Sequence, residues 1–249
     1  MTTFRRIALA TLAAPLALGL AACGSGTEEA GGLSGEPIAA IPAPAGQSWG
    51  DVVAKTPEGG YRLGNPDAPI KLIEFASHTC GACANFSATG APVLKEKYVS
   101  TGVVSYEKRS LIRDPLDMTI TVLARCGAPE AFHPRASQAW AALGEFGQTL
   151  NANGALMEQA MGAPEDQRFV MVAQAAGLID WFAERGLSRD QAQACLSDSA
   201  AITALAEQSR AQADIFEVTG TPTFILNGKK LDENQWPALE PILQQAGAR

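Results

Sequence analysis

Two cysteines separated by two residues, Cys80-Gly81-Ala82-Cys83, are the side chains of this sequence best suited to chemistry. Residues three apart on a helix lie on one face, so the two sulfur atoms could close a small disulfide ring with little backbone movement. In the first turn of a helix, unpaired N–H groups and the helix dipole would stabilise a Cys80 thiolate. We therefore expect Cys80 to attack and Cys83 to resolve the mixed disulfide.

The elements around these cysteines place them where a strand passes into a helix. Residues 70–76 are an apolar-rich run with the length and composition of a buried strand, and residues 84–98 have helical spacing. A short first strand is expected at 61–64, and the next strand after the helix at 103–110. The cysteine pair would thus lie at the N-terminus of the helix, directly after a central strand.

The second half of the chain has a different pattern. Ala-, Leu- and Gln-rich segments at 115–218 predict helices, and Asn227-Gly228 predicts a two-residue hairpin turn, followed by a closing helix at 234–246. The order strand, helix, strand, helical block, hairpin, helix indicates an α/β fold. We expect its two halves to be separated by a helical insertion at about 115–215.

Several motifs together resemble the DsbA-like branch of the thioredoxin superfamily over residues 52–246. They are the run Ile73-Glu74-Phe75-Ala76-Ser77-His78-Thr79-Cys80, the helical insertion, and Thr221-Pro222 just before the hairpin. The resemblance implies a thioredoxin-like fold and disulfide exchange on exported proteins, without a cofactor beyond the protein's own cysteines. It also implies a cis Thr221-Pro222 bond beside the cysteine pair, where Thr221 could pair with an extended substrate. A trans proline that opens an edge strand is the alternative.

Two further residues near the cysteines are candidates for the site. Glu74 matches a buried acid of this family that helps to move protons, although a solvated charge at a strand end fits the sequence equally well. Lys108 is a candidate partner for Glu74, but one sequence does not determine the strand register. His78 could contact substrate or stabilise the Cys80 thiolate, and an exposed or packed histidine is the alternative.

The residues between the cysteines depart from the family pattern. Strongly oxidising members usually carry Pro-His there, and the histidine stabilises the thiolate. Gly81 and Ala82 supply neither a charge nor a side-chain donor. The sequence therefore predicts a milder oxidant than the resemblance alone implies.

Cys126 and Cys195 remain once the other cysteines are assigned. In an oxidising compartment, an even number of remaining cysteines suggests that they form a disulfide. Related DsbA-like sequences can carry a structural disulfide within the helical block. Two separate buried thiols are the alternative.

The N-terminus has the pattern of an export signal. Two arginines precede an apolar run at 7–20, which is too short to cross a bilayer of about 30 Å but suits a signal-peptide core. Leu20-Ala21-Ala22-Cys23 resembles the lipobox of bacterial lipoproteins, so we expect a signal peptide at 1–22 and lipidation of Cys23. A plain secretory signal is the alternative. Residues 23–50 are expected to be a flexible tether, and 51–249 the DsbA-like domain.

Charge and composition limit the kinds of molecule that this protein is expected to bind. The 249 residues carry 19 basic and 26 acidic side chains, and they lack the clustered Lys and Arg that nucleic acid requires. No dedicated metal site is predicted. We expect a monomer on the periplasmic side of a bacterial membrane, held by its lipid. It would act on exported proteins with thiols or disulfides and be recycled by a membrane redox partner.

Three classes of function compete for the cysteine pair. Thiol–disulfide exchange is favoured, with the direction open between oxidase and reductase; an isomerase is disfavoured because 24–50 is too poor in apolar residues to form a dimerisation domain. A copper-handling protein of oxidase assembly would instead capture Cu(I) with His78, Cys80 and Cys83. A redox-inactive binding module is the third class, and two intact cysteines with Thr221-Pro222 argue against it.

Overall fold

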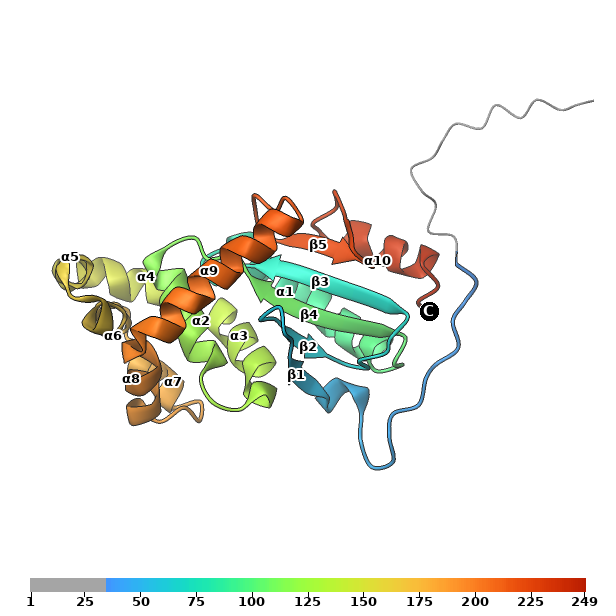
Figure 1. Cartoon of the computed structure of the whole chain (residues 1–249), viewed down its shortest axis with the longest axis horizontal. Coiled ribbons are helices and arrows are strands. Elements are labelled where there is room, and N and C mark those ends of the chain that lie inside the picture. The colour runs from blue at the N-terminus through green and yellow to red at the C-terminus, as the bar shows by residue number, and fades with distance from the viewer. Residues whose placement is uncertain (1–34) are drawn as a thin grey trace, which may run out of the picture. The chain divides into compact units, whose positions relative to one another are not determined.

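Six strands form a mixed sheet in the computed structural model of the protein, which describes residues 35–249 (Figure 1). β3 and β4 run parallel, and the other neighbouring strands are antiparallel. Helix α1 (Gly81–Val93) lies on the crossover that a parallel pair requires. In spatial order the strands are β1 (Val53–Lys55), β2 (Tyr61–Leu63), β4 (Val104–Ser110), β3 (Ile70–Ala76), β5 (Thr223–Leu226) and β6 (Lys229–Lys230).

The central strand β3 is buried along nearly its whole length, as the apolar run predicts. Of its seven residues, Lys71 alone is exposed. β3 pairs with β4 on one side and with β5 on the other, so that segments far apart in sequence meet along it. The end of β3 is therefore the point where the two halves of the chain come together.

One face of the sheet is covered by α1, the π-helical turn Leu94–Val99 that continues it, and α10 (Trp236–Gln245). Apolar side chains alternate along β3 and β4, so every second residue points into this core. The core includes Leu72, Phe86, Leu94, Tyr98, Tyr106, Phe224, Leu239 and Leu243.

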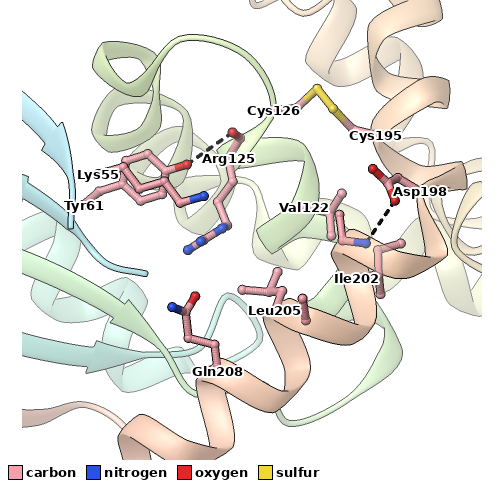
Figure 2. A pocket seen from close by; sticks show the side chains of 12 residues that line it. Lys55, Tyr61, Val122, Arg125, Cys126, Cys195, Asp198, Ile202, Leu205 and Gln208 are labelled. Carbon is pink, nitrogen blue, oxygen red and sulfur yellow. Dashed lines mark hydrogen bonds between the residues drawn. A yellow bond between two sulfur atoms is a disulfide. The ribbon is translucent and has the colours of Figure 1, made fainter. Parts of the chain in front are cut away.

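Eight α-helices and the 3-10 helix Pro129–Ala131 form the predicted insertion between β4 and β5. Eight consecutive residues of α2, from Asp117 to Ala124, are buried, so this helix lies at the centre of the block. α9 leads back to the sheet, and with the end of α2 it lines a cavity beside β1 and β2 (Figures 1 and 2). The helices are α2 (Pro115–Arg125), α3 (Phe132–Ala141), α4 (Leu143–Ala152), α5 (Gly154–Gly162), α6 (Glu165–Ala175), α7 (Leu178–Ala183), α8 (Arg189–Ser197) and α9 (Ser199–Ile215).

The predicted α/β order, with a helical insertion between two halves, is confirmed. Asn227 and Gly228 both have positive φ, 48° and 85°, which is the backbone that a tight hairpin turn requires. β1 was not expected, because Val53-Ala54-Lys55 is too short to show a periodic pattern.

The segment before the domain differs from the predicted tether. From Gly35 onward it is attached to the fold: the Gly35 N–H donates to the Gln245 carbonyl at 2.6 Å, and the Ile41 N–H donates to the Thr101 carbonyl at 2.8 Å. Trp49 is buried and donates from Nε1 to Ile41 at 2.7 Å. A segment too polar to fold alone can still pair its backbone with an existing surface, so residues 35–50 are not a free tether.

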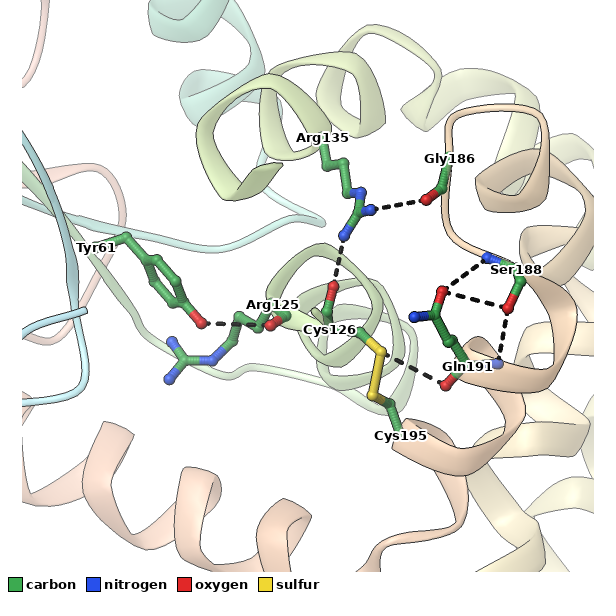
Figure 3. Close-up of a disulfide and its surroundings, with 8 residues drawn as sticks. All are labelled: Tyr61, Arg125, Cys126, Arg135, Gly186, Ser188, Gln191 and Cys195. Atoms are coloured by element: carbon green, nitrogen blue, oxygen red, sulfur yellow. Dashed lines mark hydrogen bonds between the residues drawn. A yellow bond between two sulfur atoms is a disulfide. The ribbon is translucent and has the colours of Figure 1, made fainter. Parts of the chain in front are cut away.

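Cys126 and Cys195 form a disulfide that joins the end of α2 to α8 (Figure 3). The Cα atoms are 6.2 Å apart, and the two residues are separated by 69 positions in the sequence. Arg135 lies beside the bond and donates to the carbonyl oxygens of Cys126 and Gly186. The disulfide and Arg135 thus connect α2, α3 and the loop before α8.

The disulfide is predicted to stabilise the fold. Replacing both cysteines, Cys126→Ala with Cys195→Ala, should lower the free energy of unfolding by about 4 kcal/mol, because the bond closes a long loop in the unfolded chain. Urea denaturation followed by circular dichroism measures the difference. Addition of a reductant should bring the wild type to the level of the double variant, and a wild-type midpoint insensitive to reductant would contradict the prediction.

Candidate active site

Cys80 is the N-cap of α1, directly after the loop that follows β3. Its Sγ accepts a hydrogen bond from the Cys83 backbone N–H at 3.4 Å and donates one to the Thr221 carbonyl oxygen at 3.2 Å. Both cysteines are free thiols; Cys80 is 5% exposed, whereas Cys83 is fully buried. Cys80 therefore keeps a small exposed fraction, whereas Cys83 has none.

The two thiols differ in acidity. Burial acts to raise the pKa of Cys80, but the interactions with the Thr221 side chain and with the backbone of Cys83 and Ala82 outweigh it, so the pKa is lowered. Burial raises the pKa of Cys83 strongly, and the nearby Glu74 carboxylate raises it further. Cys80 is thus the better thiolate of the pair, as a nucleophile requires.

Thr221 and Pro222 lie beside Cys80, although 141 residues separate Thr221 from it in sequence. The Thr221-Pro222 peptide bond is cis. β5 begins immediately afterwards, and its first residue, Thr223, pairs with Phe75 of β3. The pairing of these two strands therefore brings Thr221 to the cysteine.

Glu74 and Lys108 are buried opposite each other in the β3–β4 pair. Lys108 Nζ is 4.0 Å from Glu74 Oε2 and 4.1 Å from the centre of the Trp140 ring, and Tyr106 donates its hydroxyl hydrogen bond to Glu74. Burial raises the pKa of Glu74 despite these partners, and burial lowers the pKa of Lys108 to about 8. Of the two alternatives for Glu74, a buried acid or a solvated charge, the structure therefore shows the buried acid. With a raised pKa, this carboxyl can hold a proton near Cys83.

Of the two alternatives for His78, an exposed or a packed ring, the structure shows the packed one. It is 3% exposed, it stacks on Trp140 with ring centres 4.7 Å apart, and its Nδ1 lies 2.9 Å from Thr121 Oγ1. Burial and the positive charge of Lys108 lower the pKa of His78 to about 3. The ring is therefore neutral at physiological pH and does not supply a charge to the Cys80 thiolate.

Asp117 in the first turn of α2 is the residue that sequence reasoning missed. It is fully buried and accepts hydrogen bonds from the backbone N–H of His78 at 2.7 Å and of Arg113 at 3.0 Å. Acidic residues are common near helix N-termini, so the sequence predicted where the helix begins but not that the Asp117 side chain is buried. Asp117 fixes the loop that leads into Cys80.

The comparisons with known proteins agree with this geometry. A family model described as Thioredoxin matches residues 56–245, which include Cys80, Cys83 and Pro222. The chain belongs to the thioredoxin family. The DsbA-like form of the thioredoxin fold, with its helical insertion, is confirmed by the solved structures that resemble it.

Curated relatives of this thioredoxin-family chain occur in Rickettsia. An inferred protein-disulfide oxidoreductase of Rickettsia bellii is 25% identical over 195 residues, 78% of this chain and 67% of that protein. The protein of the same name in Rickettsia conorii is 26% identical over 178 residues, which span 71% of this chain and 56% of the relative. The chain thus spans little more than half of the length of some of these relatives.

Two solved structures show the same architecture. The protein-disulfide isomerase of Novosphingobium aromaticivorans is 29% identical, with a TM-score of 0.70, and the match covers 75% of this chain and 96% of that one. Alpha-DsbA1 of Wolbachia pipientis is 20% identical, with a TM-score of 0.59, and the match covers 75% and 89% of the two chains. The second likeness shows the fold alone.

The relatives and the site favour thiol–disulfide exchange over copper handling. Of the three ligands proposed for Cu(I), His78 is buried against Trp140 and Thr121. Among residues 35–249, no group of three His, Cys, Asp or Glu side chains could hold a metal ion. Exchange chemistry is therefore the activity that the arranged residues support.

The predicted signal peptide and Cys23 lie outside the described residues. Within the described part of the chain, no helix has the length and apolar character needed to cross a membrane.

Replacement of the buried acid, Asp117→Asn, is predicted to change how stability depends on pH. Burial raises the pKa of Asp117 from 3.8 to about 6, so the folded state binds this proton more tightly than the unfolded state. Its contribution to stability therefore falls as the pH rises through that interval. The Asn variant lacks this titration. The wild type should thus lose roughly 3 kcal/mol relative to the variant between about pH 4 and pH 7.

Urea denaturation of both proteins across this range provides the measurement. His78 titrates over much of the same range with the opposite sign, because its pKa is lowered to about 3 in the folded protein. Because Asp117 Oδ1 lies 3.8 Å from His78 Nδ1, both proteins carry His78→Gln in this measurement, which removes the His78 titration from the comparison. Parallel stability curves for the two proteins would contradict the prediction.

Proposed function

We propose that the protein is an exported, lipid-anchored thiol–disulfide oxidoreductase that uses Cys80 and Cys83 on exported protein substrates. The observation that carries the proposal is the unequal environment of the two thiols. Cys80 caps α1 with a lowered pKa, and Cys83 is fully buried with a raised one. This asymmetry gives each cysteine a separate step of the exchange.

The proposed reaction transfers two electrons without a further cofactor. When the enzyme is reduced, the Cys80 thiolate attacks a substrate disulfide, forms a mixed disulfide and releases one substrate thiolate. Cys83 then loses its proton and attacks Cys80 Sγ, which forms the enzyme disulfide and releases the second substrate thiolate. The reverse sequence oxidises a substrate dithiol and returns the enzyme to the reduced state.

Glu74 is proposed to accept and return the proton of Cys83. Its own pKa is raised by burial, and its charge is coupled to that of Cys83. Lys108 and Tyr106 hold its carboxylate in place. The buried thiol can therefore be deprotonated without water entering the core.

Thr221 and Pro222 are proposed to line the substrate site. The Thr221 carbonyl oxygen lies 3.2 Å from Cys80 Sγ, so a peptide bound next to it would bring its own sulfur close to the nucleophile. An extended substrate can add to such a backbone edge by strand pairing. This arrangement selects exposed, flexible segments without requiring a particular sequence.

The N-terminal sequence supports a proposal for where in the cell the enzyme works. The proposed signal peptide at 1–22 and lipidation at Cys23 would place the DsbA-like domain of 51–249 on the periplasmic side of a bacterial membrane. A membrane redox partner would restore the working state of the cysteines. We propose that the protein acts there as a monomer.

Single cysteine variants test whether Cys80 attacks the substrate and Cys83 resolves the mixed disulfide. Cys83→Ser should accumulate a mixed disulfide with oxidised insulin, because the resolving thiol is missing. Cys80→Ser should form none, because the remaining thiol is buried and has a raised pKa. Non-reducing electrophoresis separates the adduct, and insulin reduction and oxidation of a reduced substrate, assayed side by side, report turnover.

The Cys126–Cys195 disulfide stays intact in both variants, so their folding can be compared directly. Exchange activity that survives Cys80→Ser would discard the mechanism. Because the structural neighbour from Novosphingobium aromaticivorans is a protein-disulfide isomerase, a scrambled-ribonuclease assay is included. We expect the isomerase rate to be the lowest of the three.

The redox potential is predicted to lie below the range of strong oxidases. Gly81 and Ala82 carry no charge, and His78 is neutral and packed, so the Cys80 thiolate is stabilised by backbone groups and by Thr221. Equilibration with glutathione should therefore give a potential more negative than about −120 mV. Ala82→His should raise it. A wild-type potential at or above that value would refute this expectation.

A further inference from the structure

A cavity of about 410 Å³ lies between the first two strands and the helical block. Its walls come from β1, β2, α2, α8 and α9 (Figure 2), and the residues Cys80, Cys83, Thr221 and Pro222 are not part of its lining. Proteins bind small molecules in cavities of about 300 to 1,000 Å³. The cavity is thus large enough for a ligand, and the exchange reaction makes no use of it.

One end of the cavity is cationic. The half-buried Arg125 points its guanidinium into the open space, and Lys55 lies beside it (Figure 2). Arg125 donates from Nη1 to the Gly59 carbonyl oxygen at 2.9 Å and lies 5.0 Å from the centre of the Tyr61 ring. Within residues 35–249, neither cation has a carboxylate within 4.0 Å.

A partly buried charge without a counter-ion favours the binding of an anion. Burial lowers the pKa of Arg125, and the Gly59 carbonyl oxygen and the Tyr61 ring offset the burial of its charge only in part. The planar guanidinium presents paired N–H donors that match the two oxygens of a carboxylate. Lys55 adds a second positive charge on a flexible, exposed side chain. A carboxylate would therefore offset the cost of burying Arg125.

The other end of the cavity is apolar. Val122 and Ile202 are buried, Leu205 is half-buried, and the Cys126–Cys195 disulfide closes the wall behind them (Figure 2). Such a surface binds a hydrocarbon or aromatic group through the hydrophobic effect. The ligand that fits both ends has one charged head and an apolar body.

Asp198 limits the charge of the ligand. It lies at the end of the cavity away from Lys55, and its Oδ1 accepts a hydrogen bond from the Ala201 N–H at 2.9 Å, as the N-cap of α9 (Figure 2). A second anionic group placed at that end would be repelled. A monoanion is thus preferred over a dicarboxylate.

We propose that this cavity binds a small monocarboxylate with an apolar body. Arg125 and Lys55 hold the carboxylate, and the apolar part lies along α9 toward the Cys126–Cys195 disulfide. The site is independent of the exchange reaction, so failure of one proposal leaves the other intact.

Decanoate is the probe, and decanol is its matched neutral control. Isothermal titration calorimetry of the wild type should show one decanoate site and at least about tenfold weaker binding of decanol, because decanol lacks the charge that pairs with Arg125. Equal affinities for the two probes, or no binding of decanoate up to about 1 mM, would overturn the proposal.

Three variants locate the site. Arg125→Gln and Lys55→Gln remove one positive charge each, and Ala201→Trp fills the apolar side from an exposed position of α9. Arg125→Gln should weaken decanoate binding by about tenfold or more, Lys55→Gln by a smaller factor, and Ala201→Trp should abolish it. The matched control is Arg189→Gln, an exposed cation of α8 outside the cavity, which should bind decanoate like the wild type.

Circular dichroism establishes that each variant is folded. Because Lys55 is exposed and makes no ion pair within the described residues, Lys55→Gln keeps the test valid even if Arg125→Gln is destabilised. Wild-type affinity in both Lys55→Gln and Ala201→Trp would place decanoate elsewhere and refute the site.

Discussion

The pairing of β3 with both β4 and β5 is the constraint on which the rest of this structure depends. One register sets Glu74 opposite Lys108 on β4 and Phe224 on β5. The same register brings Thr223 opposite Phe75, so the Thr221 carbonyl oxygen reaches the cysteine at the start of α1. A shift by one residue would turn the buried charges of β3 and β4 to the other face and separate the two halves of the site.

Burial, more than any ion pair, determines the electrostatics of the site. It raises the pKa values of Glu74 and Cys83 and lowers those of Lys108 and His78. Cys80 is the exception, because the backbone of α1 and the Thr221 side chain lower its pKa. Of these groups, the two acids in the core resist a negative charge, and Cys80 Sγ, the outermost sulfur, carries one most readily. That order suits a reaction in which the outer sulfur attacks first and the inner one follows.

Long-range packing also explains where the sequence-based expectations differ from the structure. The helical block and the hairpin were predictable, because helical spacing and Asn227-Gly228 are local signals. The attachment of the segment after Gly35 was not, since it depends on carbonyl groups of Gln245 and Gly247 at the other end of the chain. The packing of His78 was not predictable for a similar reason, because its environment consists of Trp140 and Thr121 from the insertion.

The sequence by itself determined the chemistry at the cysteine pair. The spacing of Cys80 and Cys83, with a strand before them and a helix after them, is enough to place one sulfur at the helix terminus and the other one turn inside. Only the tertiary structure decided the partners: that Lys108 faces Glu74, that Asp117 fixes the loop before Cys80, and that Arg125 opens into a cavity. The physical reason is that helix geometry follows from neighbouring residues, whereas strand register and burial depend on residues distant in the chain.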